Sequence, residues 1–219
     1  TSQAPGYDGH CRERSRGDLL KSRSAGNKVV VRARVPQTGN ATFVDTIRGR
    51  VSFALNTIAD YVILKSDGLP TYHLASVIDD HEMNITHVIR AEEWLPSTPR
   101  HTLLYEWLGY DIPVLAHVPI VLAEDRTKLS KRHGAASTIE LRDQGYLPEA
   151  VFNFLALLGW SAGDDRELMT LDEIVDSFSL ERIKEAPAIF DREKLTWMNG
   201  VYIRDMNPSE LVDATIPYL

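Results

Sequence analysis

The sequence predicts an α/β protein in which a small sheet comes first and helices dominate the last third. Apolar and polar residues alternate over 28–35 and again over 41–53, as expected of half-buried strands. A third strand is predicted over 60–65, where the turn Ser66-Asp67-Gly68 ends it. Because these three segments follow one another closely, we expect them to form one small antiparallel sheet.

Helix patterns appear in the middle of the chain. Residues 71–78 predict a short helix. Thr98 followed by Pro99 is typical of an N-cap and a first-turn proline. A second helix is therefore expected from there to Trp107, with Gly109 as its stop.

Two predicted strands in the same part of the chain end on residues that suit ligand binding. The first, 87–89, ends on Arg90. The second, 114–122, is interrupted by Pro119 and leads into a cationic loop over 128–132. Alternation of strands and helices indicates an α/β sheet, and such sheets bind ligands at the carboxyl ends of their strands.

After Gly134 the pattern becomes helical. Ser137 is a typical N-cap, and Pro148 is a typical first-turn proline. The helices predicted here cover 137–145, 150–158, 171–178, 191–198 and the residues from 208 onward.

Composition and charge narrow the class of protein. The chain has 219 residues, 43% of them apolar, and no apolar run approaches the ~20 residues of a membrane-spanning helix. Cys11 is its one cysteine, so a reducing, cytoplasmic location without disulfides is expected. The net charge of −7 argues against a nucleic-acid partner, but cations gather near the start and in loop 128–132. Since Thr1 is not methionine, we expect a piece of a longer protein.

The loop Lys128-Leu129-Ser130-Lys131-Arg132 places three cations within five residues. Ammonium groups are compact charges that suit phosphate oxygens, and they can stabilise the charge that builds up when a triphosphate loses pyrophosphate. A solvated surface loop is the alternative for any basic pentamer. The position of this loop, after a buried strand, favours phosphate binding.

The same pentamer resembles the KMSKS signature of class I aminoacyl-tRNA synthetases. Other blocks resemble the bacterial-type glutamyl-tRNA synthetases in particular, in the right order and over nearly the whole chain. These blocks are Tyr7-Asp8-Gly9 with Cys11-Arg12, Gly68-Leu69-Pro70-Thr71-Tyr72-His73-Leu74-Ala75, Asp79-Asp80-His81, His87-Val88-Ile89-Arg90-Ala91-Glu92-Glu93-Trp94, Ser97-Thr98-Pro99, Phe190-Asp191, Lys194-Leu195, and Trp197-Met198-Asn199-Gly200 with Tyr202-Ile203-Arg204.

The resemblance implies how the chain is organised. Residues 1–70 would be the C-terminal part of an α+β insertion domain that binds the acceptor end of tRNA. Residues 71–137 would be the second half of a Rossmann-like catalytic domain, followed by an α-helical stem-contact domain over 138–205. Residues 206–219 would begin the anticodon-binding region.

The implied activity has two steps. The α-carboxylate of L-glutamate attacks the α-phosphorus of ATP, which is accompanied by Mg²⁺, and the glutamyl group then passes to the 3′ end of tRNA(Glu). Lys128 and Lys131 are the implied catalytic groups. The implied ATP-binding residues are Leu122, Lys128, Leu129, Ser130, Lys131 and Arg132.

Four residues are implied in glutamate binding. Arg90 resembles the arginine that pairs with the γ-carboxylate, and a guanidinium fork suits a carboxylate because it binds both oxygens. It also rejects glutamine, whose amide donors would face the cation unpaired. Tyr72 and Trp94 resemble walls of the same pocket, with a core aromatic as the alternative. Ser76 stands where some members carry asparagine, so one direct hydrogen bond to the substrate can be lost.

Cys11 occupies the place of one ligand in a zinc site of some family members, but Glu13 stands where they show histidine. A closed zinc site needs four suitable ligands, so we expect no bound zinc. His10 and His101 are then expected to be surface or capping residues. The implied tRNA-binding residues, with a solvated charge as the alternative for each, are Lys184, Arg192 and Lys194.

Three functions remain open. The first is a fragment of a glutamyl-tRNA synthetase. The second is a paralogue that glutamylates the queuosine base of tRNA(Asp), against which the block Trp197-Met198-Asn199-Gly200 argues. The third is a non-catalytic tRNA-binding module. The HIGH signature of class I synthetases does not occur in the 219 residues, so we expect that this chain alone does not activate glutamate. The family default is a monomer without a membrane partner.

Overall fold

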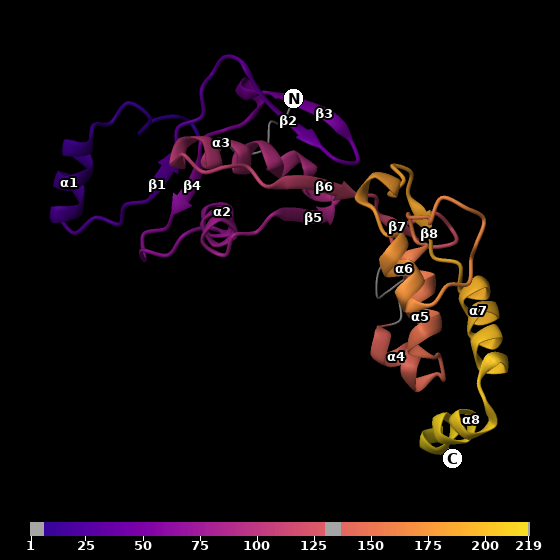
Figure 1. Cartoon of the computed structure of the whole chain (residues 1–219). Coiled ribbons are helices and arrows are strands. Elements are labelled where there is room, and N and C mark those ends of the chain that lie inside the picture. The colour runs from indigo at the N-terminus through magenta and orange to yellow at the C-terminus, as the bar shows by residue number, and fades with distance from the viewer. Residues whose placement is uncertain (1–6, 130–136, 219) are drawn as a thin grey trace. The chain divides into compact units, whose positions relative to one another are not determined.

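The computed structural model describes residues 7–129 and 137–218 (Figure 1). These residues form two compact units. The first consists of Thr1–Ile89 and Trp94–Ala116, and the second of Arg90–Glu93 and His117–Leu219. Each unit is described by itself below.

The first unit begins with a helix and a two-stranded sheet. Helix α1 (Arg16–Ser24), which the sequence pattern did not predict, starts at a capping box in which Ser15 and Asp18 exchange hydrogen bonds. Strand β1 (Val31–Ala33) pairs antiparallel with β4 (Tyr61–Leu64). The strand predicted over 28–35 is therefore shorter, although Ala33 and Val35 are buried at alternate positions as the pattern indicates.

A separate four-stranded sheet has the order β3-β2-β6-β5. Strands β2 (Asn40–Asp45) and β3 (Gly49–Ala54) form an antiparallel hairpin, and β2 also pairs parallel with β6 (Val114–Val118). Strand β5 (His87–Ala91) lies beside β6, and both strands end on residues of the second unit. The sheet is mixed, which confirms the α/β class.

The expectation of one antiparallel sheet from three N-terminal strands is wrong. The stretch 41–53 is a hairpin whose turn is closed by the buried Asp45, because its Oδ1 accepts hydrogen bonds from the backbone nitrogens of Ile47 and Arg48 at 3.0 and 2.9 Å. Gly49 follows at φ +67°, a conformation that glycine adopts without strain. The hairpin joins β6 instead of β1 and β4.

Two helices accompany these strands. Helix α2 (Tyr72–Glu82) is longer than predicted, and helix α3 (Thr98–Leu108) ends at Gly109 in the left-handed conformation, as predicted. The N-cap of α3 is wrong in the sequence analysis. A 3₁₀ helix over Glu92–Ser97 leads into α3, so Ser97 is the cap residue and the Thr98 hydroxyl donates back to the Trp94 carbonyl at 3.3 Å.

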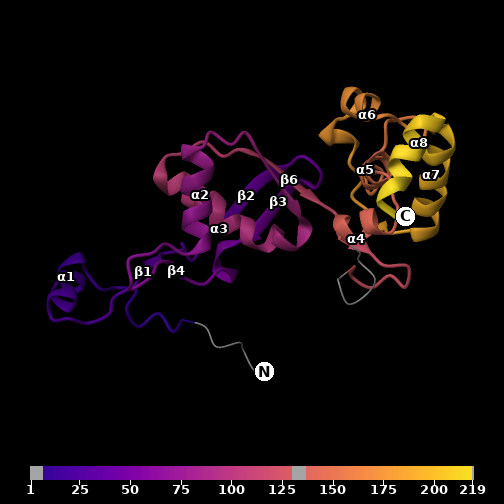
Figure 2. The ribbon, with the colours of Figure 1, turned by 90° about the horizontal axis from the view of Figure 1, so that it is seen from below.

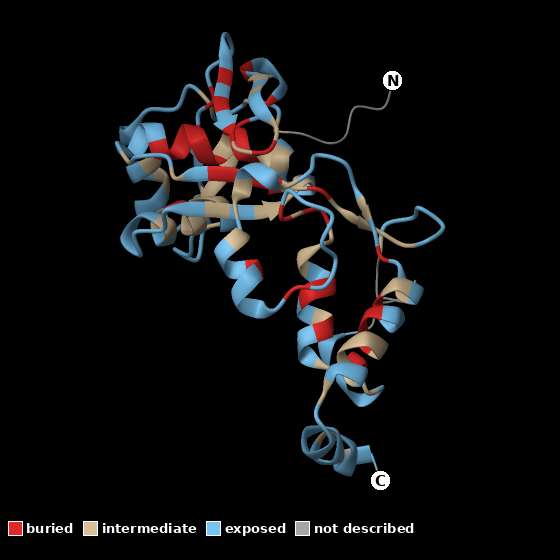
Figure 3. Ribbon diagram, turned by 45° about the vertical axis from the view of Figure 1, so that its right-hand side comes forward, coloured by how far each residue is buried: buried red, intermediate tan, exposed pale blue. Residues whose placement is uncertain are grey.

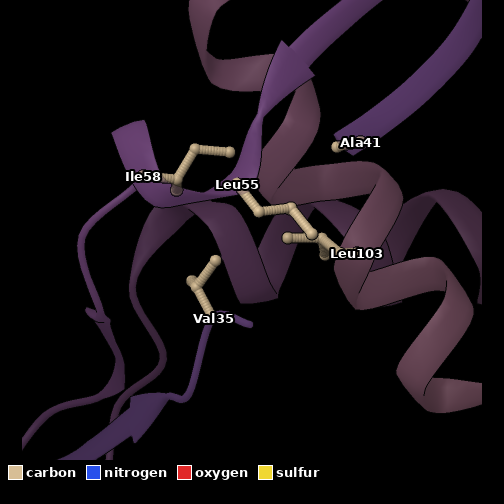
Figure 4. Close-up of a cluster of buried hydrophobic side chains, with 5 residues drawn as sticks. All are labelled: Val35, Ala41, Leu55, Ile58 and Leu103. Atoms are coloured by element: carbon tan, nitrogen blue, oxygen red, sulfur yellow. The ribbon is translucent and has the colours of Figure 1, made fainter. Parts of the chain in front are cut away.

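The core of the first unit is shown in Figure 4. Five buried side chains, with Tyr61 packed against them, are Val35, Ala41, Leu55, Ile58 and Leu103. A second cluster joins α2 to α3 through Val77, Leu104 and Tyr105. These contacts fix α2, whose first turn carries Tyr72, against the rest of the unit.

The described residues of the second unit after β6 are mainly helical and include one short parallel pair, β7 (Val121–Leu122) with β8 (Ala188–Ile189). Strand β8 was not predicted. Helix α5 packs against α6 and α7 (Figures 1 and 2). The helices are α4 (Thr138–Asp143), α5 (Pro148–Ala156), α6 (Leu171–Ser177), α7 (Arg192–Asp205) and α8 (Pro208–Thr215).

Local start signals set several of these helices. Ser137 forms a capping box with Glu140, as its predicted N-cap role requires, and Thr170 and Asn207 cap α6 and α8 in the same way. Side-chain caps of this kind satisfy backbone N–H groups that the first turn leaves without partners.

The core of the second unit lies between α5 and α7, where the buried positions of both helices appear red in Figure 3. Leu195 and Met198 of α7 are fully buried there. The next residue, Asn199, accepts a hydrogen bond from the Leu147 backbone nitrogen at 2.8 Å and donates to the Gly145 carbonyl at 3.1 Å. Asn199 therefore ties α7 to the start of α5.

Among the helices that the structure describes, none combines the length and the apolar character needed to cross a membrane.

Candidate active site

An aromatic pair marks the candidate amino-acid pocket on the first unit. Tyr72 lies in the first turn of α2 and Trp94 in the 3₁₀ helix, and their rings are 5.3 Å apart between centroids. Tyr72 is 53% exposed and Trp94 38% exposed, so neither is an ordinary core aromatic. Ser76 is half-buried one helical turn after Tyr72, on the same side of α2.

Two histidine rings, those of His73 and His101, contact the Tyr72 ring. The Nδ1 atom of His73 and the Nε2 atom of His101 are 2.8 Å apart, and the Tyr72 ring lies 5.7 and 5.9 Å from the two imidazoles. His101 is only 5% exposed. The expectation that His101 is a surface or capping residue is therefore wrong, because α3 turns it toward α2.

Arg90 lies near the end of β5 and belongs to the second unit. Its Nε donates a hydrogen bond to Nε2 of His117 at 3.0 Å. His117 lies on the neighbouring strand β6 and is fully buried. His117 was not among the predicted site residues. The available signal was a histidine within the apolar run 114–122.

Lys128 follows a tight turn after β7. Backbone hydrogen bonds from Ala123 to Thr127 and from Leu129 to Val121 close the turn at 2.8 and 3.0 Å, and Arg126 adopts φ +64° within it. The Leu129 side chain packs on the core of the second unit. Leu129 therefore anchors the start of the signature loop, while Ser130, Lys131 and Arg132 lie outside the described residues.

The ammonium group of Lys128 forms an ion pair with Glu93. The two side chains are 61% and 47% exposed, so the pair is worth only about 0–1 kcal/mol. A more highly charged anion can therefore displace Glu93 at little cost. Glu93 is a second residue that the sequence analysis did not single out.

Leu122 is half-buried at the end of β7. Its carbonyl accepts a hydrogen bond from the backbone nitrogen of Phe190 at 2.8 Å, so part of its backbone is used in joining β7 to the segment after β8. The role of Leu122 toward ATP stays a prediction.

The three candidate tRNA-binding cations differ in their surroundings. Lys184 is exposed, Arg192 donates to the side-chain oxygen of Gln144, and Lys194 pairs with Glu167. One cavity of about 620 Å³ lies along α7, and its lining residues are Glu124, Arg192, Glu193, Thr196, Trp197, Gly200 and Arg204. The α7 members fall at positions 192, 193, 196, 197, 200 and 204, so they lie along one face of the helix.

The residues around Cys11 do not suit a metal. Cys11 is exposed, and Glu13 forms an ion pair with Arg34 at 2.7 Å. Within the described part of the chain, no group of three or more histidine, cysteine, aspartate or glutamate side chains could hold a metal ion. Arg12 instead ties this segment to the buried Asp60.

The mixed sheet and the KMSKS-like sequence at 128–132 agree with what a comparison with known families found. Residues 1–197 match the model of the catalytic domain of class I tRNA synthetases (E and Q). The chain belongs to this family.

Curated relatives within the family carry the name glutamate–tRNA ligase. The chain is 52% identical over 217 residues to a glutamate–tRNA ligase of Dehalococcoides mccartyi and 50% identical over 215 residues to that of Moorella thermoacetica. These matches cover 99% and 98% of the chain but only 43% and 44% of the relatives, so the chain spans less than half their length.

Solved structures agree with these relatives. A glutamate tRNA ligase from Elizabethkingia meningosepticum, in complex with its amino acid, is 39% identical with a TM-score of 0.85 and matches 93% of this chain. Glutamate-tRNA synthetase from Elizabethkingia anophelis is 38% identical, with a TM-score of 0.87 over 96% of this chain. The chain covers 45% and 47% of these two structures.

Proposed function

We propose that the chain is part of a glutamate–tRNA ligase, which activates L-glutamate with ATP to glutamyl-adenylate and transfers it to the 3′ end of tRNA(Glu). The observation that carries this proposal is the segment Arg90–Glu93 in the second unit. Its first residue is a guanidinium suited to a carboxylate, and its last pairs with Lys128 at the start of the signature loop. The segment thus supplies one cation, Arg90, for a carboxylate, and through Glu93 it contacts a second cation, Lys128, for a phosphate.

Glutamate recognition is assigned to four residues. Arg90 binds the γ-carboxylate through two parallel hydrogen bonds, which glutamine cannot accept with its amide nitrogen. Tyr72 and Trp94 supply aromatic walls, which their exposed contact supports. Ser76 contributes a hydroxyl from the next turn of α2.

The adenylation step needs no general base, because the α-carboxylate of glutamate is already ionised. It attacks the α-phosphorus of ATP, and the bond to pyrophosphate breaks. Lys128 leaves Glu93 and, with Lys131, stabilises the charge that builds up on the departing phosphate oxygens. Leu122, Leu129, Ser130 and Arg132 complete the ATP site. The phosphates themselves carry Mg²⁺, an ion that keeps few protein ligands.

The remaining assignments follow the family. Residues 1–70 contact the acceptor end of tRNA, residues 71–137 form the second half of the catalytic domain, residues 138–205 contact the tRNA stem, and residues 206–219 begin the anticodon-binding region. Lys184, Arg192 and Lys194 bind phosphates and position the tRNA without reading its sequence. The protein works as a cytoplasmic monomer and binds no zinc.

ATP–pyrophosphate exchange tests the proposal. The full-length gene product is expected to exchange pyrophosphate in the presence of L-glutamate and tRNA(Glu), and not with L-glutamine. The 219-residue chain alone is expected to be inactive, because the HIGH signature does not occur in it. Equal exchange with glutamine, or none with either amino acid, contradicts the proposed function.

Charging assays separate the alternative functions. A glutamate–tRNA ligase attaches [¹⁴C]glutamate to the 3′ end of tRNA(Glu), and removal of the 3′-terminal adenosine abolishes the reaction. A base-glutamylating paralogue would instead label tRNA(Asp), and removal of its 3′-terminal adenosine would not prevent labelling. A non-catalytic module would label neither.

A further inference from the structure

His117 is a buried polar side chain whose presence the proposed chemistry does not yet explain. It lies within the apolar strand β6 and has no exposed surface. Buried polar groups are stable only when hydrogen-bonded, and an apolar residue would fill this position more simply. The Nε2 atom of His117 accepts a hydrogen bond from the Nε of Arg90 at 3.0 Å, and this contact links His117 to a proposed glutamate-binding residue.

The direction of this hydrogen bond fixes the tautomer of His117. An arginine Nε always carries a hydrogen and can only donate. The Nε2 atom of His117 must therefore be the acceptor, which places the ring proton on Nδ1. A doubly protonated imidazolium could not accept this bond.

We propose that His117 is a positioning residue that orients the Arg90 guanidinium toward the γ-carboxylate of glutamate. This inference rests on the proposed function, since it takes glutamate as the substrate. With Nε bonded to His117, a carboxylate that binds the guanidinium bidentately meets its two terminal Nη groups and not the Nε edge. A rotatable guanidinium would offer either edge.

The two residues come together through the sheet. Each is the last residue but one of its strand, and β5 and β6 are neighbours. The contact therefore forms at the ends of both strands, where ligands of α/β sheets bind. Strand packing sets the direction of the guanidinium before the substrate arrives, which lowers the ordering cost of binding.

Two substitutions of similar size test the role in the full-length enzyme. In His117→Asn the amide nitrogen replaces the Nδ1 donor, but the side chain is too short to reach Arg90. In His117→Gln the amide oxygen can take the place of Nε2 and accept the bond. H117N is expected to raise the KM for glutamate roughly 10-fold, the effect of losing one charge-assisted hydrogen bond. H117Q is expected to stay within about 3-fold of the unsubstituted enzyme, well short of that loss.

The controls separate positioning from folding. The KM for ATP is expected to stay unchanged in both variants. His87→Gln, an exposed histidine on β5, serves as the matched control and should have no effect on either KM. Thermal unfolding of each variant, followed by circular dichroism, shows whether it is folded at the assay temperature.

A double-mutant cycle shows whether His117 acts through Arg90. If it does, H117N changes the kinetics little in an Arg90→Ala background, so the two effects are not additive. An unchanged glutamate KM in H117N, or the same 10-fold loss with and without Arg90, overturns the proposal. Failure of the proposed function looks different: the unsubstituted enzyme shows no glutamate-dependent exchange, or R90A keeps a normal glutamate KM.

Discussion

Breaking the ion pair between Arg12 and Asp60 should destabilise the first unit. Asp60 has a side chain only 5% exposed, and Arg12 is 19% exposed. Asp60 also accepts a hydrogen bond from the backbone nitrogen of Val35 at 2.9 Å, while Arg12 donates to the Val35 carbonyl at 2.6 Å. The pair thus fastens the segment around Cys11 to the core that contains Val35.

The substitution Asp60→Asn removes the charge and keeps the shape. An asparagine oxygen can still accept the bond from Val35, so the change isolates the ion pair. Removing one partner of a buried pair costs roughly 3–5 kcal/mol, because the other charge is left buried. Arg12 keeps its bond to the Val35 carbonyl and some contact with water. We therefore expect a loss of about 3 kcal/mol, at the lower end of that range.

The single cysteine provides the assay. A spin label attached to the exposed Cys11 reports on this segment without further substitutions, and urea titration of the labelled chain gives its free energy of unfolding. Glu13→Gln is the matched control, because Glu13 and Arg34 are 76% and 61% exposed and their pair should contribute below about 1 kcal/mol. If D60N costs no more than E13Q, the reasoning about burial is refuted.

Four further outcomes are expected. Lys128→Ala in the full-length enzyme should lower kcat of pyrophosphate exchange by roughly 10²–10³-fold with little change in the glutamate KM; a change confined to KM would contradict a transition-state role. Leu195→Ala should destabilise the second unit by about 3 kcal/mol in urea, whereas the exposed Leu211→Ala should stay within about 0.5 kcal/mol. Burial raises the pKa of Tyr61. The unfolded chain therefore loses that proton first, near pH 10, and stability should fall above this pH by about 1.4 kcal/mol per unit; Tyr61→Phe should remove that part of the alkaline slope. A chelator such as EDTA should leave the urea midpoint of the Cys11 segment unchanged, and a shift to lower urea would reveal a bound metal.

Local signals explain the parts of the fold that the sequence predicted. The start of α4 at Ser137 and the end of α3 at Gly109 each depend on residues within one turn of the boundary. Pairing between distant strands could not be predicted in this way. The Asp45↔Leu115 pair joins residues 70 positions apart, and the turn after Asp45 depends on a buried carboxylate that an alternating pattern hides.

In the candidate site, too, residues within local motifs could be predicted, whereas partners distant in sequence could not. Arg90, Tyr72 and Trp94 were singled out from motifs that lie within a short stretch of sequence, and the structure adds a contact between the two aromatic rings. His117 and Glu93 could be connected to the site only through neighbours 27 and 35 residues away in sequence, Arg90 and Lys128. Residue type alone gives no sign of such partners, because a histidine in an apolar strand is equally compatible with a structural role.

The block of residues 197–200 in helix α7 resembles the family motif, and its residues have different structural roles. In the block Trp197-Met198-Asn199-Gly200, Met198 fills the core and Asn199 fastens α7 to the start of α5, while Trp197 is 48% exposed. Two of the four residues thus maintain the architecture of the unit. A homologue that acts on a different tRNA can retain Met198 and Asn199. An enzyme that charges the same tRNA can carry two other residues there, provided that they pack and hydrogen-bond equally well. When such a block matches in a new sequence, Met198 and Asn199 report on the packing of the helical unit, and the chemistry must be judged from residues such as Arg90 and Lys128.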